Sequence, residues 1–109
     1  MSRAPGDLVE LARPAQRDLR RLSAVDRRRV QPALEALAAE TENLDIKAIT
    51  GKNPWLRLRA GNFRILHREI TAAELDARMG RVAQSNRIRG YLIARVIHRS
   101  ELKRALDSL

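Results

Sequence analysis

Arginines at positions 57, 59 and 64 have the residue type and spacing best suited to holding an anion. They lie in WLRLRAGNFRIL, residues 55–66, where they alternate with apolar residues. Arg57 and Arg59 are two residues apart, so on a strand they point to the same face. A Gly-Asn pair then predicts a tight reversal that brings Arg64 back beside them. Converging guanidinium groups repel one another unless an anion lies between them, which favours an anion site over the alternative of a solvated sheet face.

The overall charge agrees with an anionic partner. The chain carries 22 Lys and Arg against 13 Asp and Glu, which gives a net charge of +9 and a pI near 11.4. Such a field attracts nucleic acid or another acidic partner. Most of the basic residues are arginine, whose planar fork of donors fits phosphate oxygens. The alternative is a basic surface that serves only solubility.

Length and composition point to one domain in the cytoplasm. The 109 residues fit a single domain spanning 1–109, with a flexible tail over 1–6. The absence of cysteine excludes a disulfide framework and a thiolate nucleophile. No apolar run approaches the roughly 20 residues of a membrane span. The N-terminus lacks the long apolar run of a secretory signal, so we expect a cytoplasmic protein.

The first half of the chain predicts a strand and two helices. Leu8–Ala12 is short and apolar and predicts the first strand. Pro14 suits the first turn of a helix, where its missing N–H costs nothing. Ser23 and Asp26 then have the spacing of a capping box and predict the start of a second helix. Pro32 lies inside that helix, which therefore either kinks there or restarts.

The second half changes to the period of strands. In chain order we expect strands over 44–49, 55–60, 63–70 and 91–97, a loop over 80–90 and a helix over 98–109. Thr71 and Glu74 again have capping-box spacing, so 72–79 is either a short helix or an extension of the hairpin. The expected fold class is α+β: an N-terminal strand, a helical hairpin, an antiparallel sheet of three to four strands and a C-terminal helix. We expect the helices to lie on one face of the sheet.

Several segments in this order resemble a known family. ARPAQRDLRRL follows the first strand, IKAITG precedes WLRLRAGNFRIL, with its R-x-R-x-G-x-F-R pattern, and VIHRSEL is the last of the matching segments. From about Leu8 to Leu106, they resemble the RelE/ParE toxin superfamily of bacterial toxin–antitoxin systems. With the length, the charge and the element order, they are fairly specific for the superfamily and much less specific for one activity.

The resemblance implies two activities on one fold. RelE-like members cut mRNA, usually in the ribosomal A site and without metal, whereas ParE-like members inhibit DNA gyrase. It also implies a cognate antitoxin, contact with mRNA and the ribosome, no cofactor, no membrane, and operator DNA as a ligand of the toxin–antitoxin complex. Our first hypothesis is a metal-free endoribonuclease. The alternatives are a gyrase inhibitor and an inactive member that only binds antitoxin.

The resemblance also implies roles for individual residues. Arg57 matches a basic strand position, Arg64 matches the arginine of the G-x-Y/F-R motif, and His98 and Arg99 match the closing H-R pair. These are the expected catalytic residues. The further residues expected to contact RNA are Arg59, Lys52, Arg68 and Lys103.

RNA cleavage without metal needs a base, an acid and a cation for the pentacoordinate phosphate. Arginine serves as the cation and hardly ever loses its proton. His67 and His98 alone have an unperturbed pKa near neutrality, and His98 is the better candidate because His67 points away from Arg64 on an ideal strand. No cysteine is available and no carboxylate has ligand spacing, so no metal site is expected.

Two features depart from the family pattern. Lys103 stands where RelE-like members commonly carry a tyrosine in the C-terminal helix, and Tyr91 begins the last strand instead. Lys103 would serve as an acid only if neighbouring arginines lowered its pKa, and otherwise it is a solvated helix lysine. Residues 71–90 form an atypical insertion, since the family usually turns quickly there.

Overall fold

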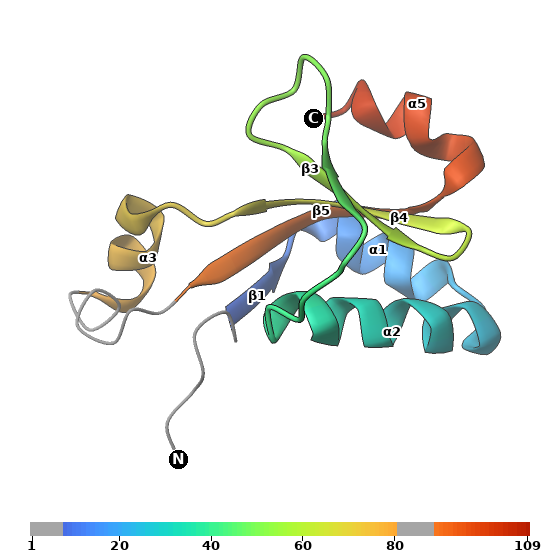
Figure 1. Ribbon diagram of the computed structural model, residues 1–109, viewed down its shortest axis with the longest axis horizontal. Helices are drawn as coiled ribbons and strands as arrows, with labels where there is room; N and C mark the ends of the chain where they lie inside the picture. The colour runs from blue at the N-terminus through green and yellow to red at the C-terminus, as the bar shows by residue number, and fades with distance from the viewer. Residues whose placement is uncertain (1–7, 81–88) are drawn as a thin grey trace.

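The computed structural model describes residues 8–80 and 89–109 (Figure 1). The expected tail at 1–6 and most of the loop expected over 80–90 lie outside these residues. In chain order the elements are β1 (Leu8–Leu11), α1 (Arg13–Arg21), α2 (Ala24–Ala38), β2 (Ile46–Ala48), β3 (Leu56–Ala60), β4 (Phe63–Glu69), α3 (Ala72–Met79), β5 (Gly90–His98), the 3₁₀ turn η1 (Arg99–Glu101) and α5 (Leu102–Leu106).

One sheet of five strands organises the molecule, in the order β1-β5-β4-β3-β2. Strands β2 to β5 pair antiparallel, as predicted, and β1 joins the edge of β5 in parallel. The α+β prediction is confirmed. The sheet is mixed and has five strands, because the first strand joins the four that follow the helices.

The helices cover both faces of this sheet, so the prediction that they lie on one face is wrong. In Figure 1, α1 and α2 lie on one side of the sheet and α5 lies on the other. The reason is β5, whose apolar side chains point both ways. Ile93 and Val96 join the core beneath α1 and α2, whereas Ala94 and Ile97 pack with Ala105 of α5. A strand that is apolar on both faces must be covered on both.

The helical hairpin forms as the sequence predicts. Pro14 stands in the first turn of α1, and the Ser23 hydroxyl accepts a hydrogen bond from the Asp26 N–H at 3.1 Å to cap α2. Helix α2 continues through Pro32. Its apolar stripe packs on the sheet, where Val30 is fully buried. This stripe therefore covers the face of β3 and β4 that carries Leu58 and Ile65.

Helix α3 (Ala72–Met79) is the predicted short helix, with Thr71 as its N-cap. The Thr71 hydroxyl accepts the Glu74 N–H at 3.2 Å, and the Glu74 carboxylate accepts the Thr71 N–H at 3.0 Å. This reciprocal cap satisfies two donors that would otherwise be unpaired at the helix start. Leu75 of α3 packs on Ile70 and on the β1–β5 end of the sheet. No helix of the described residues has the length and apolar character to cross a membrane.

Candidate nucleic-acid interface

The β3–β4 hairpin brings the three strand arginines together. Arg59 pairs directly with Arg64 across the hairpin, and Arg57 pairs with Leu66. Leu66 packs towards α5, and side chains alternate along a strand, so all three arginines lie on the α5 face. Gly61 has φ +60°, the left-handed conformation that favours glycine, and it closes the turn between the strands.

Arg64 is the centre of this group. Its Nη1 donates to the carbonyl oxygens of Gly61 and Phe63, both at 2.9 Å, so the turn itself orients the guanidinium. Burial lowers the pKa of Arg64 most, and the positive charges of Arg59, Arg57 and Arg99 lower it further. We call Arg57, Arg59, Arg64 and Arg99 the arginine cluster. Arg99 enters it from η1, whose first N–H donates to the Asn62 carbonyl of the same turn at 2.7 Å.

The arginine cluster is not neutralised by ion pairs. The ion pairs found among the described residues involve Arg68, Arg78, Arg89 and Arg95, and none involves a member of the cluster. Of the acidic groups in the described residues, Asp45 is the one whose charge acts on the pKa of Arg64 and raises it. Unit charges about 4 Å apart repel by about 1 kcal/mol in water and by about 4 kcal/mol near a protein surface. An anion bound among these guanidinium groups removes that repulsion.

One further cation on this face was missed by the sequence interpretation. Lys47 of β2 pairs with Arg57 of β3, so the pleat places both on the same face. The alternating segment that contains Lys47 was expected to be a strand, but its partner was not predicted. The register shows that this lysine extends the row of cations from Arg64 and Arg57 towards the sheet edge.

His98 does not join the cluster. It pairs with Phe63 across β4 and β5, one position beyond the Arg64–Ile97 pair, so it points to the opposite face. The two rings meet edge to face with centroids 5.7 Å apart. Its Nδ1 lies 2.8 Å from the Ser100 hydroxyl and accepts the Ser100 N–H at 3.2 Å, which caps η1. The expected grouping of His98 with Arg57 and Arg64 is therefore not found.

His67 is buried on the opposite face, as expected from its position relative to Arg64. Its side chain is fully inaccessible, and its Nδ1 lies 3.1 Å from the Ile65 carbonyl oxygen. Burial lowers the pKa of His67. A neutral, enclosed imidazole on this side of the sheet cannot reach an anion held by Arg64.

Arg68 has a structural partner that argues against its expected role in RNA binding. Its Nη1 and Nη2 donate to the two carboxylate oxygens of Glu74 at 2.7 and 2.9 Å. Its guanidinium also lies 5.6 Å from the centre of the Trp55 ring. The hydrogen bonds with Arg68, followed by those with Thr71, hold the pKa of Glu74 well below its usual range. This bidentate pair fixes α3 to β4.

The other two expected RNA contacts lie apart from Arg64. Lys52 belongs to the loop before Trp55, at the end of β3 opposite Arg59. Lys103 is exposed on α5, beside Glu101 and Asp107 in a shallow hollow. Neither is among the groups whose charge acts on Arg64. In the described residues, no three His or acidic side chains are grouped as a metal site.

Comparison with known structures supports the fold. The chain is similar to a chain of the RelB–RelE antitoxin–toxin complex from Methanococcus jannaschii, with 22% identity, a TM-score of 0.59, and coverage of 86% of this chain and 94% of that one. It is also similar to a chain of the archaeal RelE–RelB complex from Pyrococcus horikoshii OT3, with 16% identity, a TM-score of 0.56, and coverage of 84% and 93%. The fold is RelE-like. No protein-family model and no curated protein sequence matches the chain.

Proposed function

We propose that this RelE-like protein is the toxin of a toxin–antitoxin pair and cuts mRNA without a metal ion. The observation that carries the proposal is the arginine cluster, in which several guanidinium groups converge and none forms an ion pair with a carboxylate of the described residues. Such an arrangement binds a phosphate and stabilises the charge that develops on it during cleavage. The solved structures with the similar fold are antitoxin–toxin complexes, which supports an antitoxin as the partner.

In this proposal the cluster holds the phosphate that is cut. The 2′-hydroxyl oxygen attacks phosphorus, the bond to the 5′-oxygen breaks, and the products are a 2′,3′-cyclic phosphate and a 5′-hydroxyl. Arg64 and Arg57 contact the phosphate oxygens, because Arg64 is oriented by the turn and Arg57 is half-buried on the same face. Arg59, Arg99 and Lys47 bind the flanking backbone. We therefore expect RNA affinity to fall steeply with salt.

The cluster contains no side chain that exchanges a proton readily near neutral pH. A base for the 2′-hydroxyl and an acid for the 5′-oxygen must therefore come from outside the cluster. This supports cleavage that depends on the ribosome, at the A site. The isolated protein is then expected to bind RNA much better than it cuts it.

Controlled expression in a bacterial host tests the proposal. Primer extension should reveal cuts at a fixed position within codons soon after induction. Arg64→Ala and Arg57→Ala should each slow cleavage by about 10²-fold or more, as expected for loss of a group that stabilises the transition state. Arg29→Ala is the matched control, because Arg29 is an exposed arginine of α2 outside the cluster.

Three results would count against the proposal. Arg64→Ala and Arg57→Ala variants that cut as fast as the Arg29→Ala control would show that the cluster is not the site. Intact mRNA together with accumulating gyrase–DNA breaks would assign the protein to gyrase inhibition instead. Normal growth with neither effect would leave antitoxin binding as its function.

A further inference from the structure

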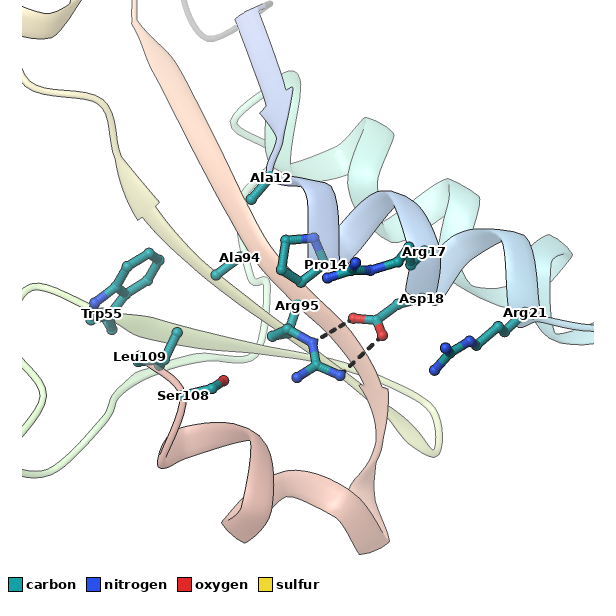
Figure 2. Close-up of a pocket in the computed structure, with 10 residues that line it drawn as sticks. All are labelled: Ala12, Pro14, Arg17, Asp18, Arg21, Trp55, Ala94, Arg95, Ser108 and Leu109. Carbon is teal, nitrogen blue, oxygen red and sulfur yellow. Dashed lines mark hydrogen bonds and ion pairs between the residues drawn. The ribbon is translucent and has the colours of Figure 1, made fainter.

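A second basic hollow lies apart from the arginine cluster (Figure 2). It has a volume of about 580 Å³ and lies between α1, β5, the residue before β3 and the C-terminal segment. We call it the α1 groove. No member of the arginine cluster lines it. Its volume falls within the range of about 300–1,000 Å³ that is usual for small-ligand sites.

A buried ion pair fixes the inner wall of the α1 groove. Strand β5 has an irregular register here: Leu66 pairs with Arg95 and His67 pairs with Ile93, so Ala94 is an extra residue. Asp18 accepts hydrogen bonds from Nε and Nη2 of Arg95 at 2.8 and 3.1 Å, and from the Val96 N–H at 2.9 Å. Figure 2 shows the guanidinium held against this carboxylate. Both carboxylate oxygens of Asp18 therefore accept hydrogen bonds. Nη1 of Arg95, in contrast, makes no hydrogen bond within the described residues.

Two more arginines line the groove. Arg17 and Arg21 are one turn apart on α1 and both are exposed. Neither makes an ion pair or a hydrogen bond with the residues that the structure describes. Like charges four residues apart destabilise a helix. Because Asp18 neutralises only Arg95, the groove keeps an excess of positive charge beside its apolar wall.

The apolar wall includes a flat aromatic side chain. Trp55 lines the α1 groove together with Ala94 and Leu109. The Arg68 guanidinium, 5.6 Å from the ring centre, and the packing of Trp55 against the α5 core hold the indole in place. Figure 2 shows Trp55 at one end of the groove and Arg17 and Arg21 at the other, with Arg95 between them. An aromatic ring and arginines that line one groove can bind single-stranded nucleic acid, because bases stack on the ring while arginines contact phosphate.

We propose that the α1 groove binds one nucleotide of single-stranded RNA, at a site separate from the arginine cluster. The phosphate contacts Arg17, Arg21 and Nη1 of Arg95, and the base lies against Trp55. The acidic side chains of a peptide would satisfy the arginines but offer no aromatic ring to stack on the indole. Occupancy of this groove does not depend on whether the arginine cluster cuts RNA.

Trp55 provides a direct test, because it is the only tryptophan of the chain. The full-length protein is titrated with adenosine monophosphate, and in parallel with inorganic phosphate, while Trp55 fluorescence is followed. Adenosine monophosphate should quench the fluorescence and bind more tightly than phosphate. Arg17→Gln combined with Arg21→Gln should weaken its binding by about tenfold or more, through loss of charge-assisted hydrogen bonds. Arg20→Gln is the matched control: Arg20 is exposed on the same helix but does not line the groove.

Each contrary result has a definite meaning. If Arg20→Gln weakens nucleotide binding as much, per charge removed, as the double variant does, the nucleotide is attracted by overall charge alone. That result would overturn the proposal. Equal affinity for phosphate and adenosine monophosphate, without quenching, would show that no base binds at Trp55. Binding of a glutamate-rich peptide without binding of the nucleotide would assign the groove to an acidic protein segment. Arg64→Ala should leave the titration unchanged, which separates this proposal from that of cleavage at the arginine cluster.

Discussion

The buried ion pair between Asp18 and Arg95 should contribute strongly to the free energy of unfolding. Asp18→Ala removes the carboxylate that holds Arg95 and leaves the buried Val96 N–H without its acceptor. Removal of one partner of a buried ion pair costs about 3–5 kcal/mol. The Arg95 side chain is 24% exposed and regains part of its hydration, so we expect a loss of about 2–4 kcal/mol. With a urea dependence of about 1–3 kcal/mol per molar, the unfolding midpoint should fall by about 0.7–4 M.

A second pair with similar geometry provides the control for this prediction. Arg78 and Glu10 are joined by two hydrogen bonds at 2.6 and 3.2 Å, but their side chains are 32% and 40% exposed. Glu10→Ala should lower the free energy of unfolding much less than Asp18→Ala does, because the partners of an exposed pair stay well hydrated when the pair is broken. Urea unfolding of both variants, followed by circular dichroism, gives the comparison. Equal losses of unfolding free energy in the two variants would refute the reasoning that burial of an ion pair, rather than the length of its hydrogen bonds, decides how much the pair stabilises the fold.

Two further predictions concern titration. Burial lowers the pKa of His67 below its ordinary 6.5, so the unfolded chain binds the extra proton and the free energy of unfolding should decrease as the pH falls below about 6.5. Urea midpoints at pH 5.5 and 7.5 should differ less in His67→Phe than in the unchanged protein, and an identical difference would contradict this. Burial, then the hydrogen bond to Glu40, raises the pKa of Tyr91 to about 12. As Tyr91 is the only tyrosine, its ultraviolet titration should show this midpoint and move towards 10 in Glu40→Ala, whereas a midpoint near 10 in the unchanged protein would oppose it.

The parts of the structure that were predictable depend on local patterns. The alternation in residues 55–66 and the turn at Gly61 determine the hairpin, and the hairpin places Arg59 opposite Arg64. The capping spacing at Thr71 and Glu74 is equally local, and α3 begins there. In each of these cases, the residues that interact are separated by only a few positions, so their spacing contains the relevant geometry.

The parts of the structure that were not predictable depend on how strands pair between residues that are far apart in the sequence. The face on which His98 lies follows from its pairing with Phe63, which is 35 positions earlier, and from the irregular register between β4 and β5. A shift of one residue moves a side chain to the opposite face of a sheet. Asp18 and Arg95 are separated by 77 positions, and no local pattern indicates that they meet. The α1 groove depends on that pair, so it was also missing from the sequence interpretation.

In the proposed reaction, the side chains of the arginine cluster bind the phosphate but do not transfer protons. Guanidinium groups keep their charge throughout the neutral range, even where burial and neighbouring cations lower the pKa, as they do for Arg64. In the proposed reaction, the charge that the cluster offers to an RNA phosphodiester is therefore the same at pH 6 and at pH 8. Any pH dependence of cleavage in this range must then come from groups outside the cluster. His98 caps η1 on the other face and His67 is enclosed, so neither histidine can supply the acid or the base of the proposed reaction at the cluster.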